Sequence, residues 1–327
     1  MYREHDNKTV ISLAGLMVLT LLTSVAAWLP AFLFAPTFSV NEGGGILFRA
    51  ITAGLVAHPL LSMGITMALL LVLGIVQCVQ SSNYRLVKTS SLLPVFFILL
   101  LPGLFVSEHT LSPGIFSAVC LYMAFTQIIT PCTGDDAQWR SLEMGFFIAL
   151  ATLFAPTCLF YLPLFWVGMY LLNRFTLLNL FASVIGCITP YILLAGFLFL
   201  TDQQAELSWQ WNVLSHQFCI QWLWSLHEVV LLALLAVALL VAFMGFLQQR
   251  SDRIHPRAIA AVAYVLAMGA WACSLLYHNA HHTIILVVFA SLCLTQYFTH
   301  RSKKLTVVYF YSLIALLLFV YGTQFIG

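Results

Sequence analysis

The chain has 327 residues, of which 62% are hydrophobic and only 7% are charged. A soluble domain carries roughly a quarter charged residues, so this chain lacks the charge to cover a water-facing surface. Its formal net charge of +2, with no large basic patch, also argues against a nucleic-acid partner. The composition predicts an all-α polytopic transmembrane helical bundle, organised as one integral-membrane domain over 1–327, with the lipid bilayer as its partner.

The cysteines do not indicate a redox or zinc framework. There are eight, nearly all within apolar segments and none in a CxxC pair, and a buried cysteine behaves as a small hydrophobe. We therefore assign no metal site, and the cofactors are unknown. The apolar run from Ile11 to Phe34 is too long for the apolar region of a signal peptide, so we interpret it as a retained first span.

Apolar segments long enough to cross a bilayer follow one another along the first part of the chain. A span needs ~20 apolar residues. A short interfacial helix from Ile46 is an option, and the sequence PCTGDDAQWRS is interpreted as a loop. The spans predicted in this part are 10–34, 56–79, 91–107 and 114–130.

The middle of the chain, 142–173, is too long for one crossing. As one straight helix it would extend ~48 Å, against a hydrocarbon core of ~30 Å. Pro156 lies midway, where a proline removes a backbone hydrogen bond and clashes with the preceding turn. We predict a short helix pair, 142–155 and 157–173, whose first pass would be only ~21 Å long.

The last part contains a tryptophan-rich segment, 203–225, that is interpreted as an interfacial helix. Four of the eight tryptophans lie in it, including Trp209 and Trp211, and tryptophan prefers the membrane–water interface. The spans predicted on either side of this segment are 177–200, 227–247, 258–277, 283–299 and 305–325.

The basic residues orient this division. Cytoplasmic loops carry an excess of Lys and Arg, and an inside N-terminus puts twelve of the thirteen basic residues inside and only Arg49 outside. The sequence therefore predicts about eleven spans, with the N-terminus cytoplasmic and the C-terminus outside. The twelve are Arg3, Lys8, Arg85, Lys88, Arg140, Arg174, Arg250, Arg253, Arg257, Arg301, Lys303 and Lys304.

The titratable groups that suit acid–base chemistry are then concentrated on the outer face. Glu42, in a glycine-containing first outer loop, is suited to act as a general base or to hold a metal, and is otherwise a solvated loop acid. Arg49 is suited to bidentate contact with phosphate or pyrophosphate, and is otherwise an interfacial anchor.

Three histidines flank a predicted outer turn, His278, His281 and His282. His278 and His282 are four residues apart, a spacing that would put them on one face of a helical turn. Binding of a phosphate, proton transfer, a metal pair and simple packing at headgroup level remain open. Trp209 and Trp211 would either hold a lipid-linked substrate or anchor the chain in the interface.

The stretch from Gly145 to Asp202 resembles a family of bacterial inner-membrane proteins with a domain of unknown function. The residues that carry the likeness are Gly145, Leu153, Phe154, Pro163, Arg174, Gly186, Pro190 and Tyr191. The resemblance implies a multi-pass protein of the bacterial cytoplasmic (inner) membrane.

The layout is also similar to integral-membrane glycosyltransferases that use polyprenyl-phosphate-linked sugars. Those enzymes have a catalytic acid in the first outer loop, where this chain has Glu42, and a short helix pair in mid-chain. The first outer loop lacks their paired acids, and no large soluble domain follows.

Three functions remain open, and whether the protein is an enzyme is uncertain. The first is an outer-leaflet transferase acting on a polyprenyl-linked glycan in envelope biogenesis, with Glu42 as base and Arg49 and the histidines binding phosphate. The second is a non-catalytic scaffold or assembly component that binds other membrane proteins. The third is a transporter or flippase, which the shortage of polar residues within the spans disfavours.

Overall fold

The computed structural model describes residues 13–34, 44–52, 58–84, 86, 91–105, 109–132, 135–202, 226–248, 254–276, 280–300 and 304–324. Every regular element in these ranges is a helix, which confirms the all-α class. The elements are α1 (Leu13–Phe34), α2 (Ile46–Thr52), α3 (Pro59–Asn83), α4 (Leu93–Gly103), α5 (Pro113–Ile129), α6 (Asp135–Phe154), η2 (a 3₁₀-helix, Pro156–Phe160), α7 (Tyr161–Leu171), α8 (Leu177–Leu200), α10 (Leu226–Leu247), α11 (Ile254–Leu276), α12 (Ala280–His300) and α13 (Lys304–Thr323).

Six of these helices are long and apolar enough to cross a membrane, by length and composition. They are α3, α8, α10, α11, α12 and α13. Shorter apolar helices are contributed by α1, α4, α5 and the η2–α7 segment. The predicted membrane-protein class agrees with this set of helices, since a helical bundle in lipid satisfies its backbone groups within each helix.

The chain does break at Pro156, as the proline predicted. Helix α6 ends at Phe154, Ala155 is extended, and a 3₁₀ turn from Pro156 leads into α7. A proline at the first position of a helix loses no bond, since that N–H would have no partner within the helix. Two helices therefore replace one, and the sequence-based split of this region is confirmed.

The start of α6 differs from the prediction. The PCTGDDAQWRS sequence was expected to be a loop, but α6 begins within it at Asp135. Its 20 residues extend ~30 Å, so the helix is longer than the expected segment of ~21 Å, although it is not one of the six helices that are long and apolar enough to cross a membrane. The first turns are polar, which is why hydropathy alone missed them.

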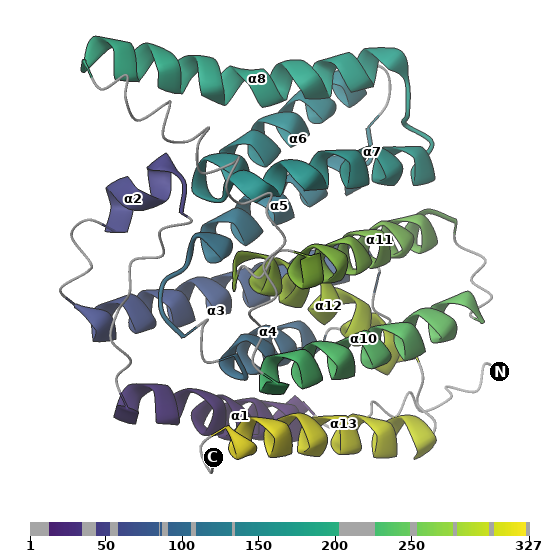
Figure 1. Cartoon of the computed structure of the whole chain (residues 1–327). Coiled ribbons are helices and arrows are strands. Elements are labelled where there is room, and N and C mark those ends of the chain that lie inside the picture. The colour runs from purple at the N-terminus through teal and green to yellow at the C-terminus, as the bar shows by residue number, and fades with distance from the viewer. Residues whose placement is uncertain are drawn as a thin grey trace.

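Helix α12 lies in the centre of the bundle, and α8 lies at its edge. Of the apolar window of α12, 83% is buried, against 28% for α8. In Figure 1, α8 runs along the top of the molecule, whereas α1 and α13 lie along the bottom. The Tyr321 hydroxyl of α13 donates to the Ala27 carbonyl of α1 at 2.7 Å, so the C-terminal halves of these two helices lie side by side.

Two glycines allow α8 to press its backbone against that of α6. A Cβ on Gly145 would collide with the Ser183 carbonyl, and one on Gly186 would collide with the Leu142 carbonyl. The Cys187 thiol donates to the Gly145 carbonyl at 3.2 Å across the same crossing. Small residues at such crossings let helices approach closely in lipid. Two residues that carry the family resemblance thus have a packing role.

The connecting ends of the helices gather into two groups, one at each end of the bundle. We call the first the Gly45 end, where Gly45 contacts Phe154, Leu111 contacts Ser62 and Tyr161 contacts His282. We call the second the Arg140 end, where Arg140 contacts Gln127, Arg174 contacts Ile128 and Tyr84 contacts Thr130.

Candidate functional site

The seven residues nominated from the sequence divide into two groups. Glu42, His278, Trp209 and Trp211 lie outside the described residues. Arg49, His281 and His282 are described, and all three belong to the Gly45 end of the bundle. The candidate site is therefore built from these three and the groups that hold them.

Arg49 is carried by α2, a short helix held firmly on the end of α6. The Gly45 N–H donates to the Phe154 carbonyl at 2.6 Å, and a Cβ on Gly45 would collide with the Leu153 carbonyl. Phe48, on the same helix, is fully buried. Arg49 itself lies on the exposed side of α2. The guanidinium is thus displayed from a fixed support, a geometry suited to anion binding.

The aromatic packing under α2 continues from α2 through α5 to α6. The Phe48 ring meets Phe116 edge-on at 6.4 Å, and Phe116 stacks on Phe154 at 5.0 Å between ring centroids. Because these contacts join three helices, the position of Arg49 is set by the same packing that closes this end of the bundle.

His281 and His282 lie in the interior, each with a side-chain exposure of 0%. They occupy the first turn of α12, which the N-terminal turn of α5 covers. A Cβ on Gly114 would lie 2.6 Å from the Cα of His281, so only glycine permits this approach. Neither ring nitrogen of His281 has a hydrogen-bond partner among the described residues. Both imidazoles are therefore enclosed by helices, unlike Arg49.

His282 is joined to α7 through Tyr161. The Tyr161 hydroxyl lies 3.2 Å from Nδ1 of His282, and the two rings are 5.9 Å apart. Tyr161 and Cys158 are also fully buried. Nearby helices α5 and α6 are joined by a hydrogen bond, which the Ser117 hydroxyl donates to the Ala151 carbonyl at 3.0 Å. In the described part of the chain, no group of three or more His, Cys, Asp or Glu side chains is arranged to hold a metal ion.

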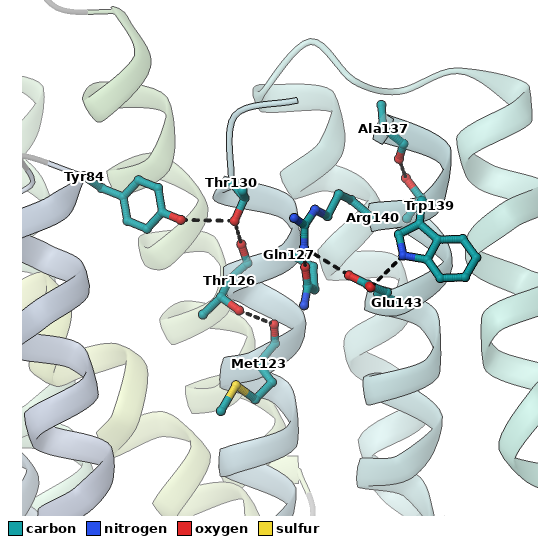
Figure 2. Close-up of polar contacts among 10 residues, drawn as sticks. Tyr84, Met123, Thr126, Gln127, Thr130, Ala137, Trp139, Arg140 and Glu143 are labelled. Carbon is teal, nitrogen blue, oxygen red and sulfur yellow. Dashed lines mark hydrogen bonds and ion pairs between the residues drawn. The ribbon is translucent and has the colours of Figure 1, made fainter. Parts of the chain in front are cut away.

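The Arg140 end contains a polar cluster that the sequence reasoning missed. The Arg140 guanidinium donates to the Gln127 side-chain oxygen at 2.7 Å and lies 3.2 Å from a Glu143 carboxylate oxygen. Trp139 donates from its indole N–H to the other Glu143 oxygen at 2.8 Å. Figure 2 shows the Arg140 guanidinium pointing toward both the Gln127 and the Glu143 side chains.

A second guanidinium contacts the same helix end. Arg174 donates to the Ile128 carbonyl at 2.9 Å, one residue beyond Gln127 near the C-terminus of α5. Cations are favourable at a helix C-terminus, where backbone carbonyls lack partners within the helix. The i,i+4 spacing of Trp139 and Glu143 and the i,i+3 spacing of Arg140 and Glu143 could have indicated a helix in the segment that the sequence analysis interpreted as a loop.

One comparison with known proteins gives a match. The model of a family of unknown function, DUF6427, matches residues 44–326. No curated protein and no solved structure matches the chain. The match extends far beyond the stretch in which the sequence showed a likeness to a family of unknown function, and it confirms that likeness.

Proposed function

Because the chain belongs to the DUF6427 family of unknown function, we propose a role from its own contacts: it is a structural component of a membrane assembly that serves envelope biogenesis. We further propose that it resides in the bacterial cytoplasmic membrane and crosses it eleven times. Its N-terminus would be cytoplasmic and its C-terminus outside.

Two observations support the topology. The Tyr321–Ala27 contact joins the C-terminal halves of α1 and α13, which agrees with parallel helices. A first and a last span are parallel only when the number of crossings is odd. Arg140 and Arg174 both contact the same end of α5. This agrees with two crossings between them, and with the positive-inside rule that assigns this end to the cytoplasm.

The observation that carries the structural role is the burial of His281 and His282. Both side chains are wholly enclosed by packed helices, beneath Gly114 and beside Tyr161. A phosphate would reach these imidazoles only if α5 or α7 moved away from α12. Their position favours a packing role at the Gly45 end, where α5, α7 and α12 meet.

Polar side chains deep in the bundle are also used to join helices. Gln77 of α3 donates to the Val288 carbonyl of α12 at 2.8 Å and accepts from the Ser291 hydroxyl at 2.7 Å. Trp28 of α1 donates to the Leu99 carbonyl of α4 at 2.9 Å. Such hydrogen bonds fix helix positions in lipid. A bundle joined in this way is suited to present a constant surface to partners.

The structural role is tested by separating exposed charges from packing. We expect Arg49→Ala and Glu42→Gln to restore the phenotype of a deletion strain as fully as the wild type. We expect Gly114→Leu, which would drive α5 away from α12, to fail. Tagged wild-type protein and both charge variants should recover the same partners after crosslinking in native membranes. Loss of function in a charge variant that is present at the wild-type level would contradict this role.

A second candidate, an outer-leaflet transferase for a polyprenyl-linked glycan, rests on α2. The fixed support beneath Arg49 would hold a guanidinium ready for a pyrophosphate at the same end of the bundle as His281 and His282. Glu42 would then be the base, and Trp209 and Trp211 would hold the lipid.

The same two charge variants test the transferase. For an enzyme, Glu42→Gln and Arg49→Ala should each reproduce the surface-glycan profile of the deletion while leaving partner recovery unchanged. If the deletion alters that profile and neither variant does, the transferase roles assigned to these residues are wrong.

A further inference from the structure

An open cavity of about 460 Å³ lies on the side of the bundle, where the C-terminal part of α3 meets α1 and the start of α4. This volume is in the range of small-molecule sites, roughly 300–1,000 Å³. The cavity belongs to neither candidate site above. Its lining residues are Met17, Cys78, Val79, Ser82, Asn83, Ser91 and Leu92.

The lining changes from apolar to polar along the axis of α3. Met17 and Val79 are apolar and about half exposed, at 51% and 55%. Ser82 and Asn83 follow within one turn, and Asn83 ends both α3 and its apolar candidate span, Leu60–Asn83. The polar end of the cavity therefore lies where the span reaches the membrane surface, and the apolar end lies deeper.

The walls of the cavity are held in place by hydrogen bonds. The Cys78 thiol donates to the Ser91 carbonyl at 2.9 Å, which ties α3 to the segment that begins α4. The Ser91 hydroxyl accepts the Leu93 N–H at 3.3 Å. A Cβ on Gly74 would lie 3.0 Å from the Cα of Val95, so the two helices also approach closely below the cavity.

We propose that this cavity binds one glycerophospholipid molecule. An acyl chain lies along Met17 and Val79, while the hydroxyls of Ser82 and Ser91 and the amide of Asn83 donate to ester and phosphate oxygens. The occupant follows from the surroundings. A phospholipid in the leaflet at the Arg140 end changes from an apolar acyl chain to a polar headgroup in the same direction as this lining changes from apolar to polar. The site is independent of the proposed function.

The test uses the full-length protein, purified in detergent and titrated with phosphatidylethanolamine or phosphatidylglycerol, with native mass spectrometry as the readout. Val79→Trp fills the apolar part of the cavity and should weaken binding of the first lipid by about tenfold. The matched control is Val308→Trp. Val308 lies four residues from its helix end, as Val79 does, and is 65% exposed, but its helix, α13, contributes none of the lining residues of the cavity.

A photo-crosslinking lipid provides a readout that does not depend on a variant. A diazirine on the acyl chain should label peptides containing Met17 and Val79 in the wild-type protein, and labelling should fall in Val79→Trp alone. Soluble glycerophosphoethanolamine should not compete, because the apolar wall needs an acyl chain. Equal losses in Val79→Trp and Val308→Trp, labelling spread evenly over the helices, or full competition by the soluble headgroup would each overturn the proposal.

Discussion

Replacing Gly186 by alanine adds one methyl group at the place where α8 meets α6. That methyl would collide with the Leu142 carbonyl oxygen, and would also lie 2.9 Å from the carbonyl carbon and 3.0 Å from the Phe146 nitrogen. All three are backbone atoms of a continuous helix, so no side chain can rotate away. We expect the two helices to separate by about 1 Å to restore ordinary contact distances.

The size of the effect follows from two opposing contributions. Overpacking a close contact costs about 1–3 kcal/mol, and a rigid backbone puts Gly186 at the upper end of that range. Alanine returns about 1 kcal/mol through its better helix propensity. Separation also weakens the Cys187–Gly145 and Trp166–Ser183 hydrogen bonds, at about 1 kcal/mol each. The expected net destabilisation is about 2–4 kcal/mol.

The control is on the same helix. A Cβ on Gly196 would meet nothing within 4 Å, so Gly196→Ala should be neutral or stabilise by up to about 1 kcal/mol. Thermal unfolding in detergent can be followed with a thiol-reactive fluorophore, because the free cysteines within the described ranges are buried or half-buried. If Gly186→Ala unfolds at the same temperature as Gly196→Ala, the close backbone contact between α6 and α8 is not what holds α8.

Two further predictions concern other contacts in the bundle. Gln77→Leu and Ser291→Ala, combined in a double-mutant cycle in the same unfolding assay, should show a coupling energy of about 0.6–1.7 kcal/mol. If the destabilisation of the double variant equals the sum of the two single effects, the hydrogen bond between these side chains is not formed. Gly114→Ala should cost about 1–3 kcal/mol, because the methyl meets the backbone of His281 at 2.6 Å. Gly322→Ala, where a Cβ meets nothing within 4 Å, is its control and should be silent.

Helices bounded by clear apolar–polar transitions could be predicted from the sequence. The span 177–200 coincides with α8, and the break at Pro156 is where the proline indicated. The start of α6 could not be predicted from hydropathy, because the polar first turns around Trp139 and Arg140 are stabilised by side-chain pairs rather than by lipid.

The candidate site was harder to predict because burial depends on packing between distant segments. His281 and His282 follow a predicted outer turn, a setting in which histidine is usually exposed or at headgroup level. Their enclosure depends on Gly114, far away in the chain, which lets the start of α5 approach α12. A lone glycine in a helix gives no such signal in a single sequence.

The most direct test of the account is the side of the membrane on which two positions lie. Alkaline phosphatase is active outside the cytoplasm, and a fluorescent protein that matures only in the cytoplasm gives the complementary signal. We predict that after Arg174 the fluorescent-protein fusion is bright and the phosphatase fusion is inactive. At the C-terminus we predict that the fluorescent-protein fusion is dark and the phosphatase fusion is active. A phosphatase-positive fusion after Arg174, or a bright fusion at the C-terminus, would contradict the eleven crossings and the separate passage of α6 and α7.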